Sequence, residues 1–254
     1  MAGNASPTEG GFPSPVEQFH LLDIVKVNVG GLDLSFTTSA FYMMASAILV
    51  GTFLVQSMKG RHLVPTRLQS MAELSYEFIA GMVRDNVGSE GRPYFPFIFS
   101  LFMFILVGNL FGMLPFGHYT YTFTSQIIVT FAMASAVFIG VTVIALMKHG
   151  LHFFTFFFPA GAPLYMAPLL IPIEILSYLS RPVSLSVRLF ANMMAGHTMM
   201  KVFGTFVVML GVFGVAPMLV LVALTGFEIL VAVLQAYVFT ILTCIYLNDA
   251  LHLH

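Results

Sequence analysis

The stretch Ser184-Leu185-Ser186-Val187-Arg188-Leu189-Phe190-Ala191-Asn192 places one cation, Arg188, inside a long apolar segment. The nearest other charges are Arg181 and Lys201, which lie about 10 Å and about 20 Å away if the segment is helical. A guanidinium deep in a bilayer costs at least about 2.5–3.5 kcal/mol, and it cannot lose its proton to avoid this cost. A cation kept there usually lies on an ion path or against a partner charge. The stretch therefore predicts a membrane-embedded helix with a functional cation.

The overall composition places the chain among polytopic membrane proteins. Of its 254 residues, 58% are hydrophobic and only 8% are charged, whereas a soluble domain carries about a quarter charged residues. The formal net charge of −1 argues against nucleic-acid binding. The single cysteine, Cys244, cannot form a disulfide within the chain, and its apolar surroundings predict a packing role. The spans hold no HExxH motif or close histidine pair, so neither a metal nor a cofactor is expected.

The charges that flank the first apolar run orient the chain in the membrane. This run extends from Thr38 to Met58 and is followed by the basic residues Lys59, Arg61 and Arg67. The positive-inside rule places this loop inside and the N-terminus outside. Residues 1–35 are expected to form an outer N-terminal tail that lacks the pattern of a signal peptide and is flexible from Met1 to Pro15. Residues 36–254 are expected to form a single membrane domain.

The middle of the chain predicts one surface helix and two further spans. Apolar residues recur at helical spacing from Thr66 to Asp85, which predicts an amphipathic helix at the membrane surface or between other helices. The runs Phe97–Phe116 and Gln126–Met147 are each long enough to span a bilayer. The following stretch, Leu151–Ile173, contains Pro159, Gly161, Pro163, Pro168 and Pro172, which disfavour a single straight helix. An inner loop or re-entrant stretch that leads into the next helix near Pro168 is expected instead.

The last two apolar segments are unusually long. They extend over about Pro168–Phe206 and Val215–Leu247, and a perpendicular span needs only about 20 residues. Such helices must tilt strongly or lie partly along the membrane plane, and Pro182 is expected to kink the first of them. No strand pattern or internal repeat is convincing. The predicted fold is an all-α polytopic membrane protein with about five transmembrane helices and one amphipathic helix.

Polar residues recur at helical spacing in the first of these long segments. Glu174, Arg181 and Arg188 are seven residues apart, so they lie near one helical face. Ser184 and Asn192 share or flank this face. The segment therefore predicts a polar stripe within an otherwise apolar helix.

The final segment continues this polar pattern. Glu228 and Gln235 are also seven residues apart and share a face. His197 lies about 13 Å along the helix axis beyond Arg188, and Glu174 lies about 21 Å on the other side. Titratable groups near each membrane surface are thus separated by a fixed cation near the middle. Because carboxylates and imidazoles are the usual intramembrane proton relays, this order predicts two water-filled half-paths separated by a positive barrier.

Several of these residues also have a simpler structural interpretation. A charge at a helix end explains Glu174 about as well as a role in a path does. Asn109 is more often a helix-packing residue than part of an ion path, and Lys201 is expected to anchor the outer surface. Glu228 is harder to explain structurally, because no other charge occurs from Val202 to Asn248. Intramembrane ionisable groups are functional by default.

Two longer motifs extend the pattern beyond single residues. They are Arg181-Pro182-Val183-Ser184-Leu185-Ser186-Val187-Arg188-Leu189-Phe190-Ala191-Asn192-Met193-Met194-Ala195-Gly196-His197 and Leu234-Gln235-Ala236-Tyr237-Val238-Phe239. Together with the stretches from Asn109 to Leu114-Pro115 and Pro15-Val16-Glu17-Gln18-Phe19, they make the chain resemble subunit a of the F-type rotary ATP synthase. The resemblance covers nearly the whole chain, and the motif around Arg188 is highly specific.

The resemblance implies a fold and a set of site residues. Members of the family have a transmembrane helix, an amphipathic helix, two further spans, and two long tilted helices that wrap the rotating c-ring. The essential arginine of the family maps onto Arg188, its motif asparagine onto Asn192, and its C-terminal-helix glutamine onto Gln235. The inner-side acidic residue maps onto Glu174. Asn109, Ser184 and Arg181 are possible supporting residues.

The outer-channel pair of the family maps onto His197 and Glu228. Many bacterial members have an acid at the first of these positions and a histidine at the second, whereas the two types are exchanged here. Both arrangements keep one acid and one imidazole. The exchange is similar to mitochondrial-like members, so it suggests an α-proteobacterial or mitochondrial-type lineage.

The implied function is that of a non-catalytic stator subunit in the CF(0) membrane sector. It forms two offset half-channels that load and unload protons on c-ring carboxylates, which couples proton flow to rotation and ATP synthesis. The expected partners are the c-ring, peripheral-stalk subunit b, the other ATP synthase subunits, lipid and protons. The expected location is the bacterial cell inner membrane, with the N-terminus outside and the C-terminus inside, and the mitochondrial inner membrane is the alternative. No Walker motif is present, so no nucleotide site is expected.

Two other classes of function were weighed against this one. A self-contained transporter would be supported by inverted repeats and broken helices in matching halves, and none is recognisable in the sequence. A purely structural membrane scaffold does not explain why Arg188 and Glu228 lie deep in lipid.

Overall fold

The computed structural model describes residues 23–25, 28–29, 32–33, 35–59, 65–113, 122–157 and 166–252. Expectations for the tail from Met1 to Pro15, for the motif residues Leu114 and Pro115, and for Pro159, Gly161 and Pro163 concern residues outside this set.

Helices make up nearly all of the described chain, which confirms the all-α architecture. The α-helices are α1 (Thr38–Met58), α2 (Arg67–Val87), α3 (Phe95–Phe111), α4 (Ile127–His149), α5 (Ala167–Met209) and α6 (Val215–Leu251). Short 3-10 helices lie between or beside them: η2 (Gly88–Tyr94), η4 (Phe123–Ser125), η5 (Gly150–Phe157) and η7 (Gly211–Gly214).

Short strands precede the first helix, and the expectation that no strand occurs is wrong for this segment. Strand β1 (Asp23–Val25) pairs antiparallel with β4 (Phe36–Thr37), and β2 (Asn28–Val29) pairs antiparallel with β3 (Leu32–Asp33). Strands of two or three residues are too short to show the alternation of apolar and polar residues that predicts a strand. They do not alter the helical architecture that follows.

Threonine side chains cap the starts of the first two helices. Ala40 donates its backbone N–H to Thr37 Oγ1 over 3.4 Å at the start of α1. Gln69 donates in the same way to Thr66 Oγ1, also over 3.4 Å, at the start of α2. Each threonine accepts from a backbone donor that has no partner within the helix.

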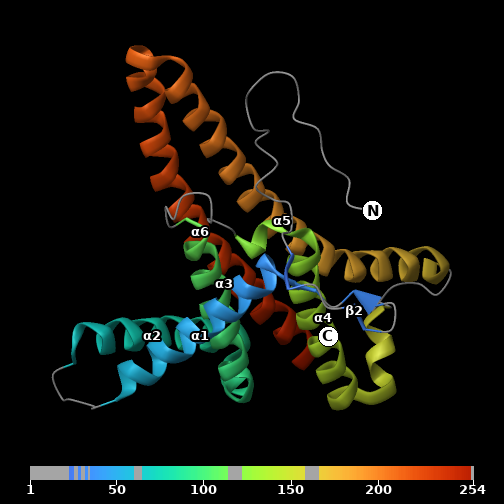
Figure 1. Ribbon diagram of the computed structural model, residues 1–254. Coiled ribbons are helices and arrows are strands. Elements are labelled where there is room, and N and C mark those ends of the chain that lie inside the picture. Colours follow the sequence, from blue (N-terminus) through green and yellow to red (C-terminus); the bar gives the residue numbers. More distant parts are fainter. Residues whose placement is uncertain are drawn as a thin grey trace.

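Helix α2 has two apolar faces. One is buried against the rest of the chain through Ala72, Ile79, Met82 and Val83. The other presents exposed apolar side chains, which are Leu68, Met71, Leu74 and Phe78. In Figure 1, α2 extends sideways from the bundle, across the direction of α3. This arrangement suits a helix that lies along a membrane surface with its outer face against lipid.

A hydrophobic core joins the helices that support the polar residues. Helix α3 contributes Ile98 and Ile105, α5 contributes Leu189, and α6 contributes Ala236 and Phe239, all of them at most 1% exposed. The side chains of α4 that enter the same core are Ala134, Val137, Val141 and Ala145. This shared core fixes α5 and α6 against the two shorter spans.

Helices α5 and α6 extend side by side as an arm beyond the rest of the molecule (Figure 1). They contain 43 and 37 residues, which confirms two unusually long helices. Helix α5 bends between its gold and orange parts in Figure 1. Pro182 lies inside the helix, where a proline removes one backbone hydrogen bond, and interior prolines are the commonest cause of a kink.

Four helical segments of the described chain are long and apolar enough to cross a membrane. They are Thr38–Met58, Arg67–Phe111 (which joins α2, η2 and α3), Ile127–His149 and Gly211–Leu251. Helix α5 is long enough as well, but it carries Glu174, Arg181, Arg188 and Lys201 along its length. The chain is therefore a polytopic membrane protein.

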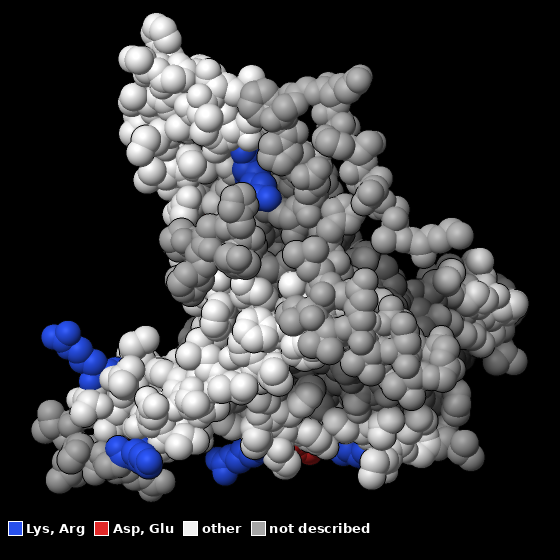
Figure 2. Space-filling view, viewed as in Figure 1, with Lys and Arg blue, Asp and Glu red and all other residues white. Residues whose placement is uncertain are grey.

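Basic residues gather along one edge of the face shown in Figure 2. Figure 2 shows most of the Lys and Arg surface of this face along its lower edge. On the side predicted to be inner, Lys148 at the end of α4 forms an ion pair with Glu90 of η2. The backbone oxygen of Ala250 lies 3.2 Å from His149 Nε2, so the end of α4 is also joined to the end of α6.

Candidate functional site

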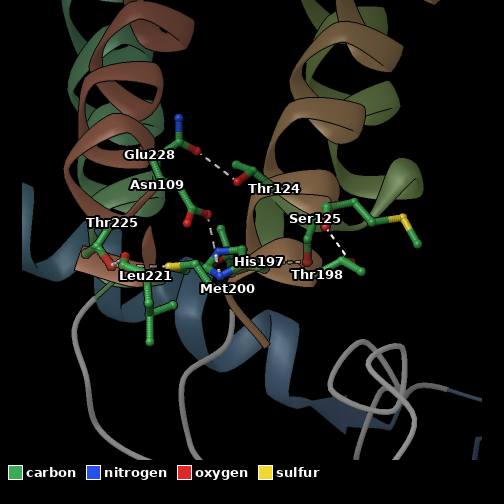
Figure 3. Close-up of polar contacts among 11 residues, drawn as sticks. Asn109, Thr124, Ser125, His197, Thr198, Met200, Leu221, Thr225 and Glu228 are labelled. Atoms are coloured by element: carbon green, nitrogen blue, oxygen red, sulfur yellow. Dashed lines mark hydrogen bonds and ion pairs between the residues drawn. The ribbon is translucent and has the colours of Figure 1, made fainter. Parts of the chain in front are cut away.

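A histidine and a glutamate from the two long helices form the buried centre of the candidate site. His197 of α5 places Nδ1 3.7 Å from Oε1 of Glu228 in α6. Their residues are only 9% and 3% exposed. Figure 3 shows the two side chains pointing toward each other across the helix–helix contact. The structure thus brings together the two residues that the resemblance placed in one pair.

The carboxylate of Glu228 is otherwise unpartnered among the described residues. Both of its oxygens are buried, and neither accepts a hydrogen bond. Gly196 of α5 allows the carboxylate to lie this close, because a Cβ atom at position 196 would be 2.7 Å from Oε1 and 2.9 Å from Cδ. A buried carboxylate without hydrogen bonds is costly in its charged form. The position therefore suits a group that binds and releases a proton.

The second ring nitrogen of His197 contacts a threonine that sequence reasoning missed. Oγ1 of Thr122 lies 2.7 Å from His197 Nε2. Thr122 directly precedes η4 and is 3% exposed. A signal was present in the sequence, since hydroxyl residues crowd the stretch from Thr120 to Ser125 just before an apolar helix.

Asn109 of α3 lies in the same region and links three elements. Its Nδ2 donates to the backbone oxygen of Ala232 in α6 over 3.1 Å. Its Oδ1 accepts a 2.8 Å hydrogen bond from Thr124 Oγ1 of η4. Asn109 is fully buried, and Figure 3 shows its hydrogen bond with Thr124. This geometry favours the packing interpretation of Asn109.

Arg188 lies on an exposed stripe of α5. The stripe consists of residues at helical spacing that no other described part of the chain covers: Ser180, Ser184, Arg188, Ala191 and Ala195. Within the described residues, Arg188 forms no hydrogen bond or ion pair. Asn192 and Gln235 are partly exposed. The structure thus leaves the guanidinium open to a partner outside this chain.

Arg181 has a different environment from Arg188, although both were expected on one helical face. Its Nη1 donates to Oδ2 of Asp249 in α6 over 3.0 Å. Its guanidinium carbon lies 5.3 Å from the ring centre of Tyr178 and 5.1 Å from that of Tyr246. These contacts join α5 to the C-terminal end of α6. They indicate a structural role, and Asp249 and the two tyrosines were not foreseen.

Glu174 lies near the start of α5, far along the helix from the buried pair. It is partly exposed and forms no hydrogen bond or ion pair with any other described residue. Its geometry is compatible with both interpretations, a charge at a helix end and a group on a proton path. Across the described chain, no three His, Cys, Asp or Glu side chains gather as a metal site would require.

Comparison with known proteins assigns these features to one family. A family model described as "ATP synthase A chain" matches residues 39–248. "ATP synthase subunit a" of Paramagnetospirillum magneticum is 58% identical over 245 residues, covering 95% of this chain and 99% of the relative. The protein of the same name from Rhodospirillum rubrum is 57% identical over 242 residues, covering 95% and 99%. The one from Pelagibacter ubique is 55% identical over 243 residues, covering 95% and 98%. The chain belongs to the ATP synthase subunit a family of membrane-sector proton-channel subunits.

Proposed function

We propose that the chain is the stator subunit that exchanges protons with the carboxylates of a rotating c-ring. The observation that carries this proposal is the environment of Arg188. It is an arginine in a membrane helix, exposed, and without an ion-pair partner among the described residues. A guanidinium at this depth needs an anion. Since this part of the chain supplies none, a carboxylate on a neighbouring membrane subunit is the natural partner.

The small side chains of the stripe around Arg188 suit a partner that moves along it. Its neighbours Ser184, Ala191 and Ala195 are small, and small residues allow another helix to approach closely. Small side chains also leave a smooth surface along which successive helices of a ring can pass. The c-ring docks against this stripe, and Asn192 and Gln235 lie beside its path.

His197 and Glu228 form the outer half-channel in this mechanism. A proton from outside passes through the pair and neutralises a c-ring carboxylate. The neutral site can rotate into lipid, whereas an ionised site is costly there. The buried carboxylate of Glu228, which accepts no hydrogen bond from the described residues, and the imidazole beside it supply the two proton-binding groups that such a transfer needs.

Proton release occurs on the inner side, near Glu174. After nearly a full turn, the ring carboxylate reaches the inner half-channel and loses its proton. Arg188 attracts the resulting anion, and its fixed charge prevents a direct leak between the half-channels. At 150 mV each proton supplies about 3.5 kcal/mol, scaled from about 2.3 kcal/mol per 100 mV.

The assembly and its orientation follow from the same account. Being a subunit of an ATP synthase, the chain works with other subunits of that complex, and we propose that they include subunit b of the peripheral stalk. Residues 36–254 form the membrane domain and residues 1–35 an outer tail. The basic residues near the inner ends of the helices support a C-terminus on the inner side of the bacterial inner membrane. ATP is formed elsewhere in the complex.

Cross-linking tests the docking surface directly. In a parent that carries Cys244→Ala, the variant Ala191→Cys should form a disulfide with a cysteine placed beside the c-ring carboxylate. Ile139→Cys is the matched control, because Ile139 is exposed on α4 instead of α5. Cross-linking at 191 but not at 139 is expected. Equal cross-linking at both positions, or at 139 alone, would contradict the proposed surface.

A further inference from the structure

Residues of two elements, η4 and α3, hold Thr122 against the candidate site. Ser125 Oγ donates to the backbone oxygen of Thr122 over 2.6 Å, which closes the turn that begins η4. Thr124 Oγ1 donates to Asn109 of α3, which fixes this turn to a neighbouring span. Thr122 itself is only 3% exposed. Its side chain is therefore held in one place and does not belong to a free outer loop.

Gly108 of α3 and Gly112, the C-cap residue that follows this helix, leave the space that this turn occupies. A Cβ atom at Gly108 would overlap the ring of Phe123, and one at Gly112 would overlap Oγ1 of Thr122. The glycines are four residues apart, so they open adjacent notches on one helical face. The Phe123 ring fills the first notch, and the hydroxyl of Thr122 fills the second. The notch at Gly112 thus allows the hydroxyl to reach His197.

The two nitrogens of His197 then have distinct partners. Nδ1 faces Glu228 Oε1 at 3.7 Å, and Nε2 lies 2.7 Å from Thr122 Oγ1. A carboxylate is acceptor-only when ionised, so it favours the tautomer with its proton on Nδ1. Nε2 is then an acceptor, and the Thr122 hydroxyl donates to it. When the ring gains a second proton, Nε2–H becomes a donor and the same hydroxyl can turn to accept.

We propose that Thr122 is a positioning residue for proton loading through the outer pair. Its hydroxyl satisfies Nε2 in both protonation states of His197, so the imidazole can gain and lose a proton without turning away from Glu228. This inference rests on the proposed function and deepens it. A side chain that served only to fill the notch would need the shape of threonine but not its hydroxyl.

Two substitutions distinguish positioning of His197 from simple filling of the notch, because each removes a different feature of threonine. Thr122→Val keeps the branched shape and removes the hydroxyl, whereas Thr122→Ser keeps the hydroxyl and removes a methyl group. ATP-driven proton pumping is measured per assembled complex in inverted membranes. We expect about a tenfold loss for Thr122→Val, which corresponds to about 1.4 kcal/mol, and a loss of less than about twofold for Thr122→Ser.

The matched control is Thr130→Val. Thr130 is another buried threonine, but within the described part of the chain its hydroxyl bonds only to backbone oxygens near the start of its own helix, α4. Pumping within about twofold of the parent is expected for this variant. If Thr122→Val fails to assemble, Thr122→Ala replaces it, because alanine also lacks the hydroxyl and needs less space.

The outcomes distinguish this inference from the function on which it rests. Normal pumping by Thr122→Val, or an equal or larger loss in Thr122→Ser, would overturn the positioning role. Arg188→Ala is measured in the same membranes. If Arg188→Ala is inactive while Thr122→Val is normal, only the inference about Thr122 fails. If Arg188→Ala pumps normally, the proposed function itself fails.

Discussion

Replacing Gly196 by alanine should disrupt proton loading by moving a single carboxylate. A Cβ atom at this position would lie 2.7 Å from Oε1, 2.9 Å from Cδ and 3.2 Å from Cγ of Glu228. Ordinary contacts begin near 3.4 Å, so the carboxylate oxygen must retreat by about 3.4 − 2.7 = 0.7 Å. Glu228 is 3% exposed and has little room to do so without leaving His197.

The size of the effect follows from the cost of such crowding. Overpacking a filled site costs about 1–3 kcal/mol, which corresponds to about 5- to 150-fold in a rate or equilibrium. We expect ATP-driven proton pumping by Gly196→Ala to fall by a factor in this range, while the complex still assembles. The assay is quenching of a pH-sensitive dye in inverted membranes, normalised to the amount of assembled complex.

Gly204→Ala is the matched control for this substitution. Gly204 lies in the same helix, and a Cβ atom there would meet no atom of the described residues within 4 Å. Alanine is also the better helix former by about 1 kcal/mol in both cases, so the helix backbone gains equally. Pumping by Gly204→Ala should match the parent. Equal pumping by the two alanine variants would refute the reasoning about the position of Glu228.

Three further predictions follow. In His197→Glu and Glu228→His, each single change should slow pumping, and the double exchange should restore part of it, because it restores one acid and one imidazole; a double variant as defective as the singles combined would show that the pair is not one unit. With Cys244→Ala as parent, cysteines beside Glu228 should react with thiol reagents from the outer phase and cysteines beside Glu174 from the inner phase, and the reverse pattern would invert the topology. Arg181→Ala should lower the free energy of unfolding of the purified complex by about 1 kcal/mol, because an ion pair and two ring contacts are lost. Thermal unfolding at the same temperature as the parent would contradict its structural role.

The sequence predicted the helices well where apolar length and capping define them. The first span was expected over Thr38–Met58, and α1 has the same bounds. Both long helices were found within a few residues of the expected ends. The end of α3 was placed at Phe116, five residues too late, because Gly112 ends the helix within a run that stays apolar. Hydropathy alone does not register such a turn.

The candidate site was predictable only in part. The approach of His197 to Glu228 came from the resemblance, since spacing within each helix says nothing about how two helices pack. Seven-residue spacing placed Arg181 and Arg188 on one face, but Arg181 pairs with Asp249 and Arg188 is exposed. The partner of Arg181 lies 68 residues away, which local patterns cannot indicate. Thr122 was missed for the same reason, because its role depends on a contact with a distant helix.

The central claim is that the fixed charge of Arg188 couples proton transfer to the movement of a neighbouring ring. ATP-driven proton pumping by membranes containing assembled Arg188→Ala complex tests it most directly, with Lys201→Ala as a control for loss of a cation from the same helix. The account predicts that Arg188→Ala does not pump, that Lys201→Ala does, and that Arg188→Lys is severely impaired, because lysine lacks the planar fork and can lose its proton when buried. Normal pumping by assembled Arg188→Ala complex would contradict the account.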